Sequence, residues 1–165
     1  MTDLPVYVLE RLFALQPDTL WRTWTEADLL AQWYGPGVET VIHKLDVRPG
    51  GVWLNEMRMK AQSGYQRAEY IEVDPPKRLV MVQSNTDSAW KTMANPGMPD
   101  WPKTMLLEVT FEPVGEGTQM QISWSPHDAS EAEIACFAGA VEQMGGGWEA
   151  GMAALEKLLA ELSLS

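Results

Sequence analysis

The chain has 165 residues, one cysteine and a formal net charge of −11 at pH 7, and no stretch approaches the roughly 20 apolar residues of a membrane span. This length is typical of one domain, so we expect a single domain over residues 1–165 that needs no disulfide or metal. A negative field repels phosphate backbones, and no basic stripe offsets it. A lone cysteine fits a reducing compartment. We therefore expect a cytoplasmic protein that binds neither nucleic acid nor a membrane.

The composition is unusual in its ten methionines and eight tryptophans. Methionine suits adaptable apolar binding surfaces, and tryptophan offers a large area with one polar group. The same residues would equally suit an ordinary apolar core. Composition alone leaves both interpretations open.

The N-terminal quarter predicts one strand and two short helices. Residues 6–13 are rich in β-branched and aromatic residues, as strands are. Pro17 suits the first turn of a helix over 16–25, and a second short helix follows over 26–33. The turn residues of "YGPG" then end it.

The middle of the chain alternates apolar and polar residues in six further segments. These predicted strands are 38–47, 52–59, 65–73, 78–84, 104–111 and 118–124. In the first of them, alternation places His43 on the same face as Val41 and Leu45. Residues 85–103 have no period, and a segment of that length is usually functional or disordered. A lid, a dimer contact and disorder all remain open for it.

The last part of the chain predicts one long helix. Apolar residues recur every seven positions from Ile134 to Leu162, over about 30 residues, and either Asp128 or Ser130 can cap the start. Three glycines, at 145–147, interrupt this pattern at a cost of about 1 kcal/mol each. We favour the interpretation that they let the helix approach a sheet closely. The alternative is a break between two helices, 129–144 and 147–162.

The element order predicts an α+β fold in which a curved seven-stranded antiparallel sheet wraps around the C-terminal helix. Such a sheet encloses more volume than one helix fills. We therefore expect a cavity between the sheet and the helix.

Several local patterns resemble the START-like (SRPBCC) superfamily and, within it, the family of homologues of the activator of the heat-shock-protein-90 ATPase. They are "AQWYGP" (31–36), "LDVRPGGVW" (45–53), "YIEVDPPKRLV" (70–80), "LLEVTFEPVGEGTQMQI" (106–122) and "GGWEAGMAALEKLL" (146–159). The resemblance implies the helix-grip (Bet v-like) fold, with two short helices after the first strand and a cavity for apolar or aromatic molecules. It implies no catalytic residue, because the family shares no catalytic motif, and its members include ligand carriers and co-chaperone domains.

Catalytic chemistry has little support in the sequence. The chain has no G-x-S-x-G elbow, no phosphate-binding glycine motif and no metal-ligand spacing, so we expect no catalytic residue, metal or cofactor. His43 could act as an acid or base inside the cavity, or be a hydrogen-bonded core histidine. Asn55 could orient a ligand or satisfy a neighbouring backbone group.

The preferred interpretation is non-catalytic binding of a hydrophobic or aromatic small molecule. The expected ligand-binding residues are His43, Trp53, Asn55, Met57, Met59, Met81, Leu107, Met120, Trp124, Met144, Trp148 and Met152, and the expected lid residues are Trp90, Met93, Met98 and Trp101. One alternative is a co-chaperone-like interaction module that contacts a chaperone, or a second copy of the chain in a homodimer. The other is a cyclase or aromatase-type enzyme that uses His43.

Overall fold

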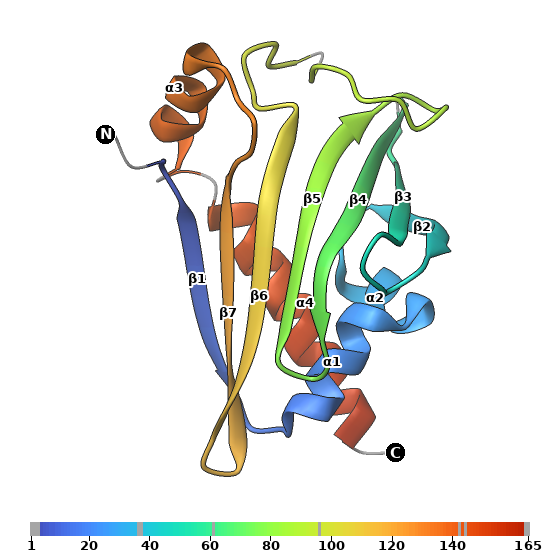
Figure 1. Ribbon diagram of the computed structural model, residues 1–165. Coiled ribbons are helices and arrows are strands. Elements are labelled where there is room, and N and C mark those ends of the chain that lie inside the picture. Colours follow the sequence, from blue (N-terminus) through green and yellow to red (C-terminus); the bar gives the residue numbers. More distant parts are fainter. Residues whose placement is uncertain are drawn as a thin grey trace.

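The strands expected from the sequence form one antiparallel sheet in the order β1-β7-β6-β5-β4-β3-β2 (Figure 1). The computed structural model describes residues 4–35, 38–60, 62–95, 97–141, 143 and 145–163. The strands are β1 (Tyr7–Phe13), β2 (Glu39–Leu45), β3 (Val52–Arg58), β4 (Ser63–Asp74), β5 (Arg78–Thr86), β6 (Thr104–Val114) and β7 (Gly117–Pro126). The seven-stranded sheet and the α+β fold class are thus confirmed.

Four helices accompany the sheet: α1 (Pro17–Thr25), α2 (Ala27–Trp33), α3 (Glu131–Ala140) and α4 (Gly145–Ser163). Pro17 stands at the start of α1, where its missing N–H costs nothing. At the start of α3, Ser130 accepts a hydrogen bond from the Glu133 backbone, and the Glu133 side chain bonds back to the Ser130 backbone. Of the two candidate caps, Ser130 is the one used.

The expected single C-terminal helix is wrong, because the chain turns between Ala140 and Gly145. α3 lies beside the end of β7, whereas α4 crosses behind the sheet toward its opposite end (Figure 1). Three consecutive glycines are the weakest stretch of the helical pattern, and they form the start of α4. Two helices are therefore present, as in the alternative, but the break lies before the three glycines and not at them, and the helix bounds differ from 129–144 and 147–162.

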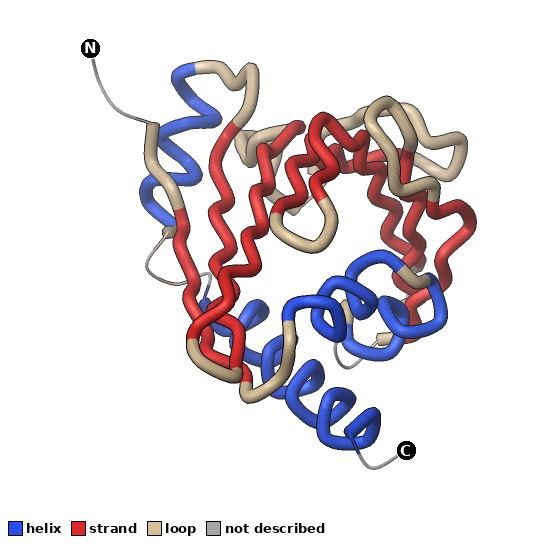
Figure 2. Tube along the Cα trace, turned by 60° about the horizontal axis from the view of Figure 1, so that its bottom comes forward, coloured by secondary structure: helices blue, strands red, loops and turns tan. Residues whose placement is uncertain are grey.

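The core lies between the inner face of the sheet and helices α1, α2 and α4. Seen after a 60° rotation, the strands form an arch whose open side these helices close (Figure 2). α1 and α2 are locked together by Trp24 and Trp33, whose rings meet edge to face at 4.8 Å, and the Trp33 indole N–H donates to the Thr23 carbonyl (2.8 Å). The sheet and α4 contribute side chains with no exposed area, including Leu79, Leu107, Val109, Ile122, Met152 and Leu155.

Two glycines provide a test of how closely the backbone packs. A Cβ at Gly117, at the start of β7, would lie 2.5 Å from the Phe13 carbonyl oxygen, whereas a Cβ at Gly139, in α3, would meet nothing within 4 Å. Gly117→Ala should lower the free energy of unfolding by about 1–3 kcal/mol through overpacking. Gly139→Ala should raise it by up to about 1 kcal/mol through helix propensity. Urea unfolding of both variants checks this, and equal midpoints would contradict it.

Candidate functional site

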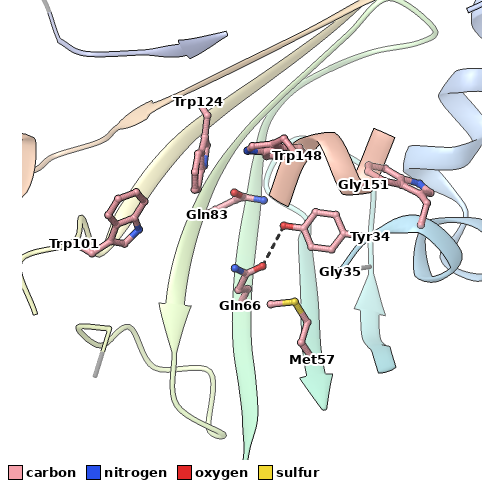
Figure 3. Close-up of a pocket in the computed structure, with 10 residues that line it drawn as sticks. Tyr34, Gly35, Met57, Gln66, Gln83, Trp101, Trp124, Trp148 and Gly151 are labelled. Atoms are coloured by element: carbon pink, nitrogen blue, oxygen red, sulfur yellow. Dashed lines mark hydrogen bonds between the residues drawn. The ribbon is translucent and has the colours of Figure 1, made fainter. Parts of the chain in front are cut away.

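A cavity of about 360 Å³ lies between the inner face of the sheet, the end of α2 and the first turns of α4 (Figure 3). Strands β3, β4, β5 and β7 contribute to its wall, and so does the segment between β5 and β6. Ten residues line it: Trp33, Tyr34, Gly35, Met57, Gln66, Gln83, Trp101, Trp124, Trp148 and Gly151.

One wall of the cavity is made of tryptophans that meet at Trp124. The Trp124 ring lies 5.9 Å from Trp101, 6.0 Å from Trp148 and 6.0 Å from Phe137, measured between ring centroids. Phe137 in turn lies 5.5 Å from Trp101 and has no exposed surface. The Trp124 ring of β7 is therefore in contact with residues from α3, α4 and the β5–β6 connection. Offset and edge-on contacts of this kind favour association of the rings beyond area burial alone.

The opposite wall carries neutral polar groups. The Tyr34 hydroxyl donates a hydrogen bond to Gln66 Oε1 (3.2 Å), and the Gln83 side chain lies beside this hydroxyl (Figure 3). Burial raises the pKa of Tyr34 to about 12, although its interaction with Gln83 opposes part of the rise. The hydroxyl is therefore protonated near neutral pH and remains a donor.

Local structure fixes the position of Tyr34 at the end of α2. Its backbone N–H bonds to Leu30, and its carbonyl accepts from the Thr40 hydroxyl (2.7 Å). The next residue, Gly35, has φ of +73°, and a Cβ there would lie 2.8 Å from Thr40 Oγ1. Only glycine fits this turn without strain.

Of the residues expected to bind a ligand, Met57, Trp124 and Trp148 line the cavity. Trp53, Met81, Leu107, Met120 and Met152 lie in the core, each at most 2% exposed. Asn55 is 1% exposed and shares the inner face of β3 with Met57, and neither of its amide atoms has a hydrogen-bond partner among the described residues. Met59 is exposed, and Met144 falls outside the described residues.

His43 lies on the opposite face of the sheet from the cavity. Register shifts between Ile42 and Lys44, so a bulge breaks the alternation from which the sequence placed His43 with Leu45. His43 Nε2 is 2.8 Å from Glu56 Oε1, and the side chain is 42% exposed. Strand alternation therefore predicted the wrong face of the sheet for His43.

Of the four expected lid residues, only Trp101 lines the cavity. Trp90 packs on the outer face, 5.3 Å from His43 and 5.4 Å from Tyr65 between ring centroids. Met93 is half-buried, and Met98 is exposed. The segment thus begins on the outer face and ends at the cavity.

Sequence reasoning missed six lining residues: Trp33, Tyr34, Gly35, Gln66, Gln83 and Gly151. Gln83 shares the inward parity of Met81, and Gln66 that of Ala68, so polar residues on an inward face were the available signal. The short stretch after α2 carried no such signal.

Glu56 is held ionised on the outer face. It accepts hydrogen bonds from the Ser63 hydroxyl (2.7 Å) and Arg58 Nε (3.3 Å) and lies beside His43. The Ser63 bond, then the His43 and Arg58 contacts, lower the pKa of Glu56 from 4.5 to about 2. A carboxylate whose folded pKa is depressed stabilises the fold above its unfolded pKa, and this contribution is lost as the pH falls.

Glu56→Gln should therefore lower the free energy of unfolding at pH 7 and reduce its dependence on pH between 4.5 and 2. Urea titrations at several pH values measure both effects. Glu116→Gln replaces an exposed carboxylate in the β6–β7 turn and serves as the control. Parallel pH profiles for wild type and Glu56→Gln would contradict this role of Glu56.

No group of three histidine, cysteine, aspartate or glutamate side chains among the described residues could hold a metal ion. None of the helices in the described part of the chain is long and apolar enough to cross a membrane.

Comparisons with known proteins agree with this architecture. Protein Ms6760 from Mycobacterium smegmatis has 19% identity and a TM-score of 0.73, with 96% of each chain covered. A protein from Rhodobacter sphaeroides has 20% identity and a TM-score of 0.75, covering 95% of this chain and 93% of that one. A protein from Arthrobacter aurescens has 17% identity and a TM-score of 0.77, covering 94% and 86%. At these identities the likeness shows the fold alone.

No curated protein sequence matches the chain significantly. Residues 14–160 match the model of the family described as "Activator of Hsp90 ATPase homolog 1-like protein". This match covers most of the chain and confirms the family that the sequence resemblance implied. The chain therefore belongs to the Activator of Hsp90 ATPase homolog 1-like family and has the helix-grip fold.

Proposed function

We propose that the protein binds an apolar or aromatic small molecule in the cavity between the sheet and α4. The observation that carries this proposal is the tryptophan wall around a space of about 360 Å³. That volume lies within the range of small-molecule sites, about 300–1,000 Å³. A family of ligand-binding and co-chaperone-like modules is consistent with it.

The chemistry of the lining supports binding rather than proton transfer. The described lining residues include one titratable group, Tyr34, and its pKa is raised to about 12. A general acid or base works best with a pKa near the operating pH. His43, the residue on which the enzyme alternative depended, bonds Glu56 on the other face of the sheet.

Filling the cavity from α4 tests the proposal. A Cβ at Gly151 would meet only the Trp33 ring, at 4.0 Å, so Gly151→Met should place its side chain in the cavity without a backbone clash. Neutral aromatic compounds should change tryptophan fluorescence saturably and raise the Tm of the wild type. Gly151→Met should abolish both effects.

Gly139→Met is the matched control, because it makes the same substitution on the exposed side of α3. This variant should bind like the wild type. A panel of aromatic compounds that gives no saturable signal with the wild type would contradict the proposal. So would equal binding by Gly151→Met and Gly139→Met.

A second candidate function is a co-chaperone-like interaction, favoured by a row of exposed apolar residues on the edge strand β1. Val8 and Leu12 in β1 are 45% and 64% exposed, Val6 just before the strand is 46% exposed, and β1 pairs with β7 on one side. Exposed apolar edge strands are common sites of pairing with another chain.

If this second function is correct, the purified chain should raise the ATPase rate of the host's Hsp90-type chaperone. Val8→Lys with Leu12→Lys should remove the stimulation by placing charge on the edge strand. Ile71→Lys changes an equally exposed residue on β4 and should leave it intact. An ATPase rate that does not respond to the wild-type chain would exclude this function.

A further inference from the structure

From the polar wall of the cavity, we infer that the ligand is a neutral planar aromatic molecule with a hydrogen-bond donor and acceptor side by side on one edge. A lactam or a carboxamide on an aromatic ring system has this edge. The inference rests on the proposed binding function and adds the chemical class of the ligand.

Charge is the first support. The lining residues that the structure describes carry no formal charge. An anion would lose its hydration there without gaining a cationic partner, and the chain's net charge of −11 would oppose its entry. A cation would be desolvated equally without a carboxylate to receive it.

The hydrogen bonds around Tyr34 are the second support. The hydroxyl has one hydrogen, which it donates to Gln66 Oε1, so toward the neighbouring Gln83 side chain it can only accept, and the Gln83 group suited to face it is the amide NH₂. The carbonyl of Gln83 and the NH₂ of Gln66 are then the groups with capacity left for a ligand. A primary amide carries two N–H donors and two acceptor lone pairs, so these bonds use only part of each. The wall therefore offers an acceptor and a donor close together.

One lining residue also has a buried polar atom without a hydrogen-bond partner among the described residues. This atom is Trp124 Nε1, on the tryptophan wall. Burying such a group without a partner destabilises the fold. A ligand with a polar edge would offset that penalty, whereas a hydrocarbon would leave it in place.

Three probes of similar shape test the inference: 2-quinolone, 2-methylnaphthalene and 2-naphthoate. They present a neutral lactam edge, no polar edge and an anionic edge. The lactam should bind about 10-fold or more tightly than the hydrocarbon, since two hydrogen bonds distinguish them, and the carboxylate should bind most weakly. Kd is measured by tryptophan fluorescence and checked by calorimetry.

Substitutions in the polar wall test whether its residues cause the preference for the lactam over the hydrocarbon. Gln66→Leu and Gln83→Leu should each reduce the ratio of lactam to hydrocarbon affinity, and Tyr34→Phe should do so with the smallest change in shape. Gln121→Leu makes the same substitution on the outer parity of β7 and should keep the wild-type ratio. A Tm within a few degrees of wild type shows that a variant is folded. If a leucine variant is not folded, the affinity ratio of Tyr34→Phe is used in its place to test the role of the polar wall.

Different results would contradict the inferred ligand class and the proposed binding function. If none of the three probes binds, the proposed binding function fails. If the hydrocarbon binds as tightly as the lactam, or the carboxylate binds best, the ligand class is wrong while the binding function stands. An affinity ratio unchanged in all three wall variants would also overturn the inference.

Discussion

The contacts of Trp124 with Phe137 and Trp148 determine how the C-terminal part of the chain must run. Both rings lie 6.0 Å from the Trp124 ring, measured between centroids. The two residues are eleven positions apart, which is about 16 Å along a straight helix at 1.5 Å per residue. On one continuous helix the two rings would be held further apart than this shared contact with one indole favours. The interruption between Ala140 and Gly145 brings them to Trp124 from two separate helices, and the three glycines begin the second of these helices.

The same interruption explains why space remains at one end of the sheet. α4 starts near Trp124 and runs toward the other end, where α1 and α2 join it and where the Trp24–Trp33 contact fills the concave face (Figures 1 and 2). Gly151 places the α4 backbone near the Trp33 ring, so the helix contributes little side-chain volume to the cavity at this point. The cavity is thus bounded by residues from seven parts of the chain: the end of α2, strands β3, β4, β5 and β7, the β5–β6 connection and the first turns of α4. A curved sheet whose concave face is only partly covered by helices leaves a cavity of this kind, whatever the ligand is.

Alternation was a sufficient guide to the strands, because each has one buried face, and both ends of all seven predicted strands fell within three residues of those observed. It failed at His43, because one extra residue in β2 reverses the facing of the side chain, and a bulge leaves no clear trace in the pattern of apolar residues. The sequence also does not show which inward-facing residues lie in the core and which line the cavity. Met81, Met120 and Trp124 share the same inward face, yet only Trp124 reaches the cavity, and the difference depends on where α4 passes. The inward parity of Gln66 and Gln83 is visible in the sequence, but parity alone does not distinguish an amide that faces a cavity from one that is enclosed in the core.

The distribution of charge separates the two faces of the sheet. The outer face carries carboxylates that are paired with cations or hydroxyl groups, as Glu56 is with Ser63 and Arg58, and Glu108 with Arg78. The inner wall instead uses amides and a phenol, which keep hydrogen-bonding capacity without the desolvation cost of an ion. Because the pKa of Tyr34 is raised to about 12, the donor pattern of that wall does not change across the physiological pH range, whereas the stabilising carboxylate of Glu56 on the outer face is lost in acid. Stability and ligand selection therefore depend on different residues, and the substitutions that alter one can be chosen to leave the other untouched.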